Sequence, residues 1–193
     1  MTEIEQILEM IRGNVVQDPL FGLGYRMRYG RPQSHFNEPR ARVIDVRGDL
    51  MAAPERLLLH GCNAQGVMGS GVAKLVRDAH PGAYDVYRAA YESRTDKSRG
   101  LDLGSYTVFK DTDRTIINGV TQEFYGREPN RVYVSYAAIE RLFLDLNHQP
   151  LTENQAIAIP RIGAGLAQGD WKTIREIIAE SVQSYYVTIY SQE

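Results

Sequence analysis

Two glycine-rich segments, each lying between an apolar run and a helical pattern, constrain the fold of this chain most strongly. The segments 66–71 and 163–169 follow the apolar runs 57–60 and 156–159. Glycine lets backbone N–H groups approach a ligand closely, and the N-terminus of a helix adds the positive end of its dipole. Each strand–loop–helix unit is therefore a potential phosphate site. Two such units at the carboxyl ends of strands in one sheet would meet in one crevice.

The chain after residue 42 alternates between short apolar runs and amphipathic stretches. Strands are expected at 43–46, 57–60, 105–109, 115–120, 156–159 and 186–190, and helices at 71–80, 135–146 and 171–181. The runs at 43–46, 57–60 and 156–159 are typical of buried strands, and the first helix should end before Pro81. Strands interleaved with helices indicate an α/β fold whose sheet is covered by helices on both faces. At 193 residues and 43% hydrophobic content, one domain with one core is expected.

The first 41 residues depart from this alternation. Thr2 is suited to cap a short helix and Gly13 to end it. Between residues 21 and 42 the chain has five arginines against one glutamate, with aromatic residues and glycines between them. We expect a helix and a basic irregular arm in residues 1–41, and the α/β domain in residues 42–193. The arm is either a solvated extension or a contact surface for nucleic acid or a second subunit.

Charge and cysteine content exclude several classes of protein. A net charge of -2 argues against a protein whose whole surface binds nucleic acid. The single cysteine, Cys62, cannot form an internal disulfide, and no cluster has the spacing of metal ligands. No apolar run approaches the roughly 20 residues that span a bilayer, and the acidic first residues do not resemble a secretory signal. We expect a cytoplasmic protein without membrane contacts.

Four separated motifs resemble those of the macro domain family, in that family's order. They are Arg47-Gly48-Asp49-Leu50, the run from Leu58 to Ala73, the pair 121–127 and 133–136, and the run from Ile159 to Leu166. The resemblance runs from about residue 42 to residue 190 and implies a three-layer α/β/α sandwich with a mixed central sheet. Within the family, the motifs are most similar to ADP-ribose 1''-phosphate phosphatases and bacteriophage-type macro domains. Neither glycine segment matches the lysine-containing P-loop or the dinucleotide fingerprint.

The resemblance implies a site for ADP-ribose without a cofactor or a metal. Asp49 would accept a hydrogen bond from the adenine amino group, and Asn63 would face the distal ribose. Residues 69–71 would hold the distal ribose and its phosphate, and residues 163–166 the pyrophosphate. The ligand contacts implied in this way are Asp49, Leu50, Asn63, Met68, Gly69, Ser70, Gly71, Val72, Arg161, Ile162, Gly163, Ala164, Gly165 and Leu166.

The resemblance also implies a catalytic histidine. In the phosphatase branch a histidine at the position of His60 is associated with hydrolysis, and imidazole is suited to moving protons at neutral pH. The alternative is a core histidine at the end of an apolar strand. Cys62 is expected to be a buried apolar residue rather than a nucleophile. A glycohydrolase branch uses a lysine and an aspartate where Gln122 and Ala167 stand here, which argues against that mechanism.

The function implied is hydrolysis of ADP-ribose 1''-phosphate to ADP-ribose and phosphate. Water would attack the distal phosphorus without a metal, His60 would move the proton, and backbone N–H groups would hold the charge. One alternative is a hydrolase that removes ADP-ribose or acyl groups from modified protein, nucleic acid or O-acyl-ADP-ribose. Another is a non-catalytic module that reads or sequesters ADP-ribose nucleotides.

Overall fold

The computed structural model describes residues 42–150, 152 and 155–192 of the chain. The helix expected near the N-terminus, and all of the basic arm except Arg42, lie outside the described residues. The elements are β1 (Val43–Arg47), η2 (Leu50–Ala52), β2 (Leu57–Asn63), α2 (Gly71–Ala79), α3 (Pro81–Glu92), η3 (Lys97–Arg99), β3 (Tyr106–Lys110), β4 (Thr115–Gln122), α4 (Tyr136–Leu146), β5 (Ala156–Pro160), α5 (Trp171–Ser181) and β6 (Tyr186–Ser191).

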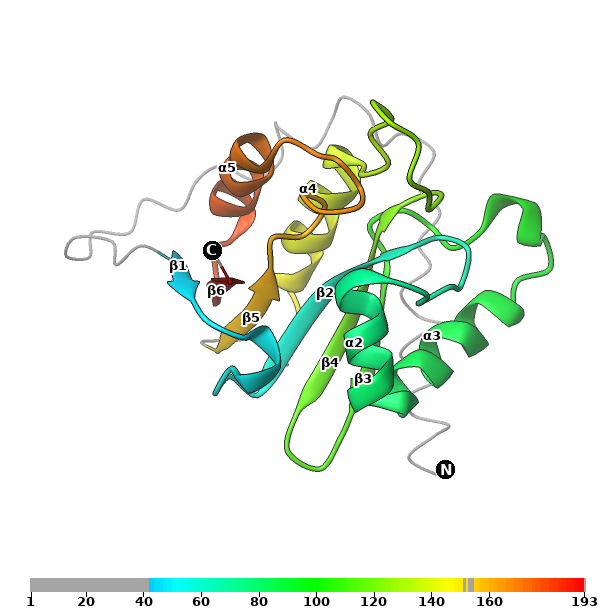
Figure 1. The fold of residues 1–193 in the computed structure, drawn as a ribbon. Coiled ribbons are helices and arrows are strands. Elements are labelled where there is room, and N and C mark those ends of the chain that lie inside the picture. The colour runs from blue at the N-terminus through cyan, green and yellow to red at the C-terminus, as the bar shows by residue number, and fades with distance from the viewer. Residues whose placement is uncertain (1–41, 151, 153–154, 193) are drawn as a thin grey trace. The chain divides into compact units, whose positions relative to one another are not determined.

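The described strands form one mixed sheet of six strands in the order β1-β6-β5-β2-β4-β3. Every neighbouring pair is parallel except β3 with β4, which is antiparallel. The helices lie on both faces of the sheet, as Figure 1 shows, so the expected three-layer α/β/α sandwich is confirmed. Because five of the strands run in one direction, their carboxyl ends lie along one edge of the sheet.

Alternating side chains of β2 divide the core between the two faces of the sheet. Leu57 and Leu59 pack in a cluster with the apolar faces of α4 and α5. Leu58 packs with Val76 of α2 and Ala83 of α3 on the opposite face. This period of two is that of a pleated strand buried on both sides.

The structure corrects two expectations at the level of secondary structure. No helix was expected after Pro81, but α3 begins there, because the fixed φ of proline suits the first helical position and its missing N–H is not needed. Helix α3 buries Ala83 and Tyr87 against the sheet. The strand at 43–46 was expected to be buried, whereas Ile44 is 50% exposed, because β1 is the outermost strand beside β6. Among the described helices, none is both long and apolar enough to span a membrane.

Candidate functional site

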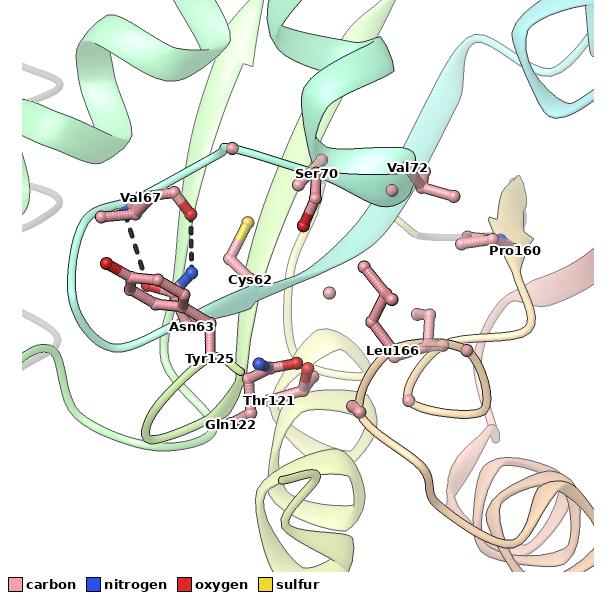
Figure 2. Close-up of a pocket in the computed structure, with 18 of the residues that line it drawn as sticks. Cys62, Asn63, Val67, Ser70, Val72, Thr121, Gln122, Tyr125, Pro160 and Leu166 are labelled. Atoms are coloured by element: carbon pink, nitrogen blue, oxygen red, sulfur yellow. Dashed lines mark hydrogen bonds between the residues drawn. The ribbon is translucent and has the colours of Figure 1, made fainter. Parts of the chain in front are cut away.

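A cavity of about 430 Å³ opens at the carboxyl ends of β2, β4 and β5. Its wall comes from the first glycine loop (residues 64–70), the second glycine loop (161–170) and the β4–α4 loop (123–135). Figure 2 shows Ser70 and Val72 on one side of the cavity and Leu166 on the other. The volume lies in the range of small-molecule sites. The two glycine-rich segments therefore meet at one crevice.

Asn63 fixes the first glycine loop. Its Nδ2 donates a hydrogen bond to the carbonyl oxygen of Val67 at 2.6 Å, and its Oδ1 accepts one from the N–H of Gln65 at 2.9 Å. The hydroxyl of Tyr87 donates a hydrogen bond to the carbonyl oxygen of Asn63 at 2.5 Å. Figure 2 shows the contact between Asn63 and Val67 as a dashed line. The loop leads directly into α2 at Gly71, so N–H groups that lack partners within the helix lie at the cavity wall.

The glycines of the second glycine loop serve two different purposes. Gly163 has a φ of +77°, and a Cβ there would lie 2.6 Å from the side chain of Val134. A Cβ on Gly169 would lie 2.5 Å from the side chain of Val134. The N–H of Gly169 donates a hydrogen bond to the carbonyl oxygen of Gly163 at 2.8 Å. Gly165 lines the cavity, and a Cβ there would meet no atom within 4 Å. Close packing against Val134 requires glycine at 163 and 169, whereas Gly165 keeps the cavity open.

The β4–α4 loop joins the two glycine loops. The N–H of Tyr133 donates to the carbonyl oxygen of Ala167 at 2.9 Å, and Gln168 Nε2 donates to the carbonyl oxygen of Glu128 at 2.8 Å. On the other side, Gln65 Nε2 donates to the carbonyl oxygen of Glu123 at 3.2 Å. The three loops therefore form one hydrogen-bonded rim.

The charged side chains in the cavity wall are both cationic. Arg127 and Arg161 line the wall, and in the described part of the chain no aspartate, glutamate, lysine or histidine does. The guanidinium of Arg161 lies 5.7 Å from the ring centroid of Trp171. Such a wall favours an anionic ligand.

Ten of the ligand contacts implied by the resemblance line this cavity. They are Asn63, Gly69, Ser70, Gly71, Val72, Arg161, Ile162, Gly163, Gly165 and Leu166. Asp49, Leu50, Met68 and Ala164 do not line it. Leu50 and Met68 are buried in the core clusters on the α2–α3 face. Asp49 is exposed just after β1, on the same edge of the sheet, where its Oδ1 accepts a hydrogen bond from the N–H of Met51 at 2.9 Å.

The structure adds wall residues that the sequence analysis did not assign to the site. They are Gly61, Cys62, Val67, Ala73, Thr121, Gln122, Tyr125, Gly126, Arg127, Pro160 and Ala167. Most lie at or just beyond the carboxyl ends of β2, β4 and β5. The signal available in the sequence was the motif 121–127, whose place after a strand is the same as that of the glycine loops.

His60 lies beneath the cavity and not in its wall. It has no exposed surface, and its Nε2 lies 2.8 Å from Asn118 Oδ1. Asn118 Nδ2 donates to the carbonyl oxygen of Ala83 and to Thr107 Oγ1, so Asn118 Oδ1 is the acceptor and His60 Nε2 is the donor. The other ring nitrogen, Nδ1, lies 3.8 Å from Cys62 Sγ and can accept from the thiol.

Burial sets the protonation states of this pair. It lowers the pKa of His60 to about 4, so the imidazole is neutral at pH 7, and it raises the pKa of the Cys62 thiol. Because side chains two apart in a strand share a face, His60 and Cys62 point the same way, and only Cys62 reaches the wall. The imidazole itself does not line the cavity.

Comparisons with curated proteins find two relatives that match most of the described domain and one that matches a shorter stretch. The chain is 34% identical over 143 residues to an uncharacterized 17.5 kDa protein of Enterobacteria phage T4, covering 69% of this chain and 85% of that protein. It is 41% identical over 51 residues to an ADP-ribose 1''-phosphate phosphatase of Aspergillus fumigatus, covering 26% of each chain. It is 29% identical over 144 residues to a DNA ADP-ribosyl glycohydrolase of Thermus aquaticus, covering 72% of this chain but only 37% of that protein. No profile of a known protein family matches the chain.

Solved structures share the fold. The macrodomain of Thermus aquaticus DarG has a TM-score of 0.62 and 27% identity, covering 77% of this chain and 97% of that chain. Thermosipho africanus DarTG in complex with ADP-ribose has a TM-score of 0.62 and 19% identity, covering 76% of this chain and 41% of that chain. The second likeness bears on the fold alone.

Proposed function

The chain belongs to the macro domain family, and from this premise we propose that its cavity binds ADP-ribose and hydrolyses ADP-ribose 1''-phosphate to ADP-ribose and inorganic phosphate. The observation that carries the proposal is the meeting of two glycine loops at one cavity whose permanently charged wall residues are both cationic. The local similarity to the Aspergillus fumigatus phosphatase supports it.

The order of the strands sets the direction of the ligand. Asp49 follows β1, the second glycine loop follows β5, and the first glycine loop follows β2, in that order along the sheet edge. We place the adenine near Asp49, the pyrophosphate against the second glycine loop and the distal ribose against the first. The group on the distal ribose then lies toward β4. Backbone N–H groups preset around it stabilise negative charge as it develops on the phosphate.

The proton in this reaction comes from water and not from His60. The oxygen of water bonds to phosphorus, the bond from phosphorus to O1'' breaks, and a proton of the water passes through a phosphate oxygen to O1''. This route suits a wall that, among the described residues, offers no carboxylate or imidazole. We assign His60 a positioning role, in which its hydrogen bonds to Asn118 and Cys62 hold the end of β2.

Removal of ADP-ribose from DNA is the second candidate function, because the Thermus aquaticus glycohydrolase matches a long stretch of the chain. Gln122 speaks against a lysine-based version of that reaction. It lies in the cavity wall, and its neutral amide donates a hydrogen bond to the carbonyl oxygen of Phe124 at 2.7 Å. A side-chain amide donates hydrogen bonds but does not gain or lose a proton near pH 7, so it cannot serve as the general acid or base that a lysine amine provides.

A substrate panel separates the candidate functions. The protein is incubated with ADP-ribose 1''-phosphate, an ADP-ribosylated DNA oligonucleotide, an ADP-ribosylated peptide and O-acetyl-ADP-ribose, each with and without EDTA. We expect phosphate release from the first substrate to be fastest and to persist in EDTA, because no described cluster of His, Cys, Asp or Glu could hold a metal ion. Release of ADP-ribose from DNA without release of phosphate would replace the proposal with the second candidate. Tight ADP-ribose binding without any turnover would leave a binding module.

Replacing Asp49 should weaken ADP-ribose binding. Loss of a charge-assisted hydrogen bond to the adenine amino group lowers affinity by roughly ten- to a hundredfold. Asp49→Ala also removes the cap of η2, so Asp49→Asn is the matched variant: its Oδ1 keeps the bond to the N–H of Met51 and presents an amide donor to the adenine. Calorimetry should show weakened binding in both variants. Unchanged affinity in Asp49→Asn would remove this residue from the adenine site.

A further inference from the structure

Arg127 and Arg161 are the charged residues of the cavity wall, and of the two only Arg127 makes no polar or ring contact with a residue that the structure describes. Arg161 already contacts the ring of Trp171, and Arg131, four residues further on, pairs with Glu128 at 3.0 Å. Arg127 makes no hydrogen bond, ion pair or ring contact with any residue that the structure describes, and it is exposed. A guanidinium carries five N–H donors in a planar fork that matches two oxygens of a phosphate. Its donors are therefore free for a ligand.

The backbone on both sides of Arg127 is held in place. A Cβ on Gly126 would lie 2.1 Å from the hydroxyl of Tyr133, so Gly126 packs directly against that ring. The N–H of Glu128 donates to the same hydroxyl at 3.3 Å, and the carbonyl oxygen of Glu128 accepts from Gln168 of the second glycine loop. A side chain with free donors therefore starts from a fixed backbone, which lowers the entropy cost of binding.

The position of Arg127 along the sheet identifies the part of the ligand that it meets. The β4–α4 loop follows β4, which lies beyond β2 when counted from β1. A ligand with its adenine near Asp49 therefore presents its distal ribose, and any group on that ribose, to this loop. The pyrophosphate lies against the second glycine loop, after β5. Arg127 is thus a wall residue of the loop that we place at the distal end of the ligand, where the substrate carries its 1''-phosphate.

We propose that Arg127 binds the 1''-phosphate of the substrate and is the residue that distinguishes ADP-ribose 1''-phosphate from ADP-ribose. This inference rests on the proposed function and deepens it, because it names the side chain that recognises the phosphoryl group transferred to water. The guanidinium donates two hydrogen bonds to the phosphate dianion, holds it for attack by water and stabilises the charge that develops on it.

Binding and turnover of Arg127 variants test this assignment. Calorimetry on ice, with brief injections, compares the affinities of ADP-ribose and ADP-ribose 1''-phosphate, and a phosphate assay follows turnover. Wild type should bind the 1''-phosphate more tightly. Arg127→Ala should lose that preference, and its kcat/KM should fall by roughly ten- to a hundredfold. Its affinity for ADP-ribose should stay within about twofold of wild type. Arg127→Lys should be intermediate, because an ammonium lacks the fork.

Arg131→Ala is the matched control. It removes one positive charge from the same loop, and Arg131 does not line the cavity. Its affinities and kcat/KM should stay within about twofold of wild type. Equal losses in both variants would show a general charge effect and overturn the assignment, as would wild-type preference and turnover in Arg127→Ala. If tighter binding of ADP-ribose 1''-phosphate depends on Arg127 but the protein releases no phosphate, the assignment of Arg127 is supported and the proposed function is refuted.

Discussion

Replacing Gly165 by valine should abolish ADP-ribose binding and leave the fold intact. Gly165 lines the cavity, its φ is not positive, and a Cβ there meets no atom within 4 Å. Valine therefore fits the backbone and extends into the space where we place the pyrophosphate. We expect calorimetry to show an affinity lower by more than roughly a hundredfold. The melting temperature should stay within about 2 °C of wild type.

Gly163→Ala is the control for loop packing. At this position φ is +77° and a Cβ would lie 2.6 Å from Val134. Alanine should therefore lower the free energy of unfolding by roughly 1–3 kcal/mol. If Gly165→Val binds ADP-ribose as wild type does, the second glycine loop does not hold the pyrophosphate.

Replacing His60 by alanine should mainly lower the stability of the fold, and not the rate of the reaction. The change leaves a cavity in the core and removes the donor that satisfies Asn118 Oδ1, which together should lower the free energy of unfolding by about 3 kcal/mol. His60→Gln keeps a donor of similar reach and should lose less. In folded His60→Gln, kcat should stay within about threefold of wild type. A fall in kcat by roughly 10²–10⁴ with stability and ADP-ribose affinity intact would instead support the proton carrier expected from the sequence.

The pKa of His60 adds a pH dependence to this prediction. Its folded pKa of about 4 lies below the ordinary value of 6.5, so the unfolded chain takes up the proton first as pH falls. The stability from this group is present above about pH 6.5 and is lost toward pH 4. Between pH 7.5 and pH 5 the loss should be about 2 kcal/mol. Urea titrations of wild type should show it, and those of His60→Gln should show correspondingly less.

The sequence predicted those parts of the fold that depend on local patterns. Helix α5 spans Trp171–Ser181 as expected, and α4 begins one residue after Ser135, whose side chain caps it. Hydrophobic spacing and caps define such elements without help from the rest of the chain. The sequence pattern does not predict α3, because a proline marks the end of the helical pattern before it without showing that another helix begins there.

The site was predictable where backbone conformation defines it and not where side-chain direction does. The glycine loops are visible in the sequence because few other residues allow their conformation. The environment of His60 depends on Asn118, which is 58 residues away. No local pattern places those two side chains together. Arg127 was not assigned either, because its place in the wall depends on contacts between the β4–α4 loop and the second glycine loop.

The most direct test of the proposed reaction is the fate of the oxygen of water. Wild-type protein hydrolyses ADP-ribose 1''-phosphate in water enriched in oxygen-18, and mass spectrometry or phosphorus NMR measures the isotope in the phosphate at an early time. If water attacks phosphorus, each phosphate released carries one oxygen from the solvent. Phosphate released without the heavy isotope would mean that the bond from C1'' to oxygen breaks instead, as in a glycohydrolase, and would contradict the proposed mechanism.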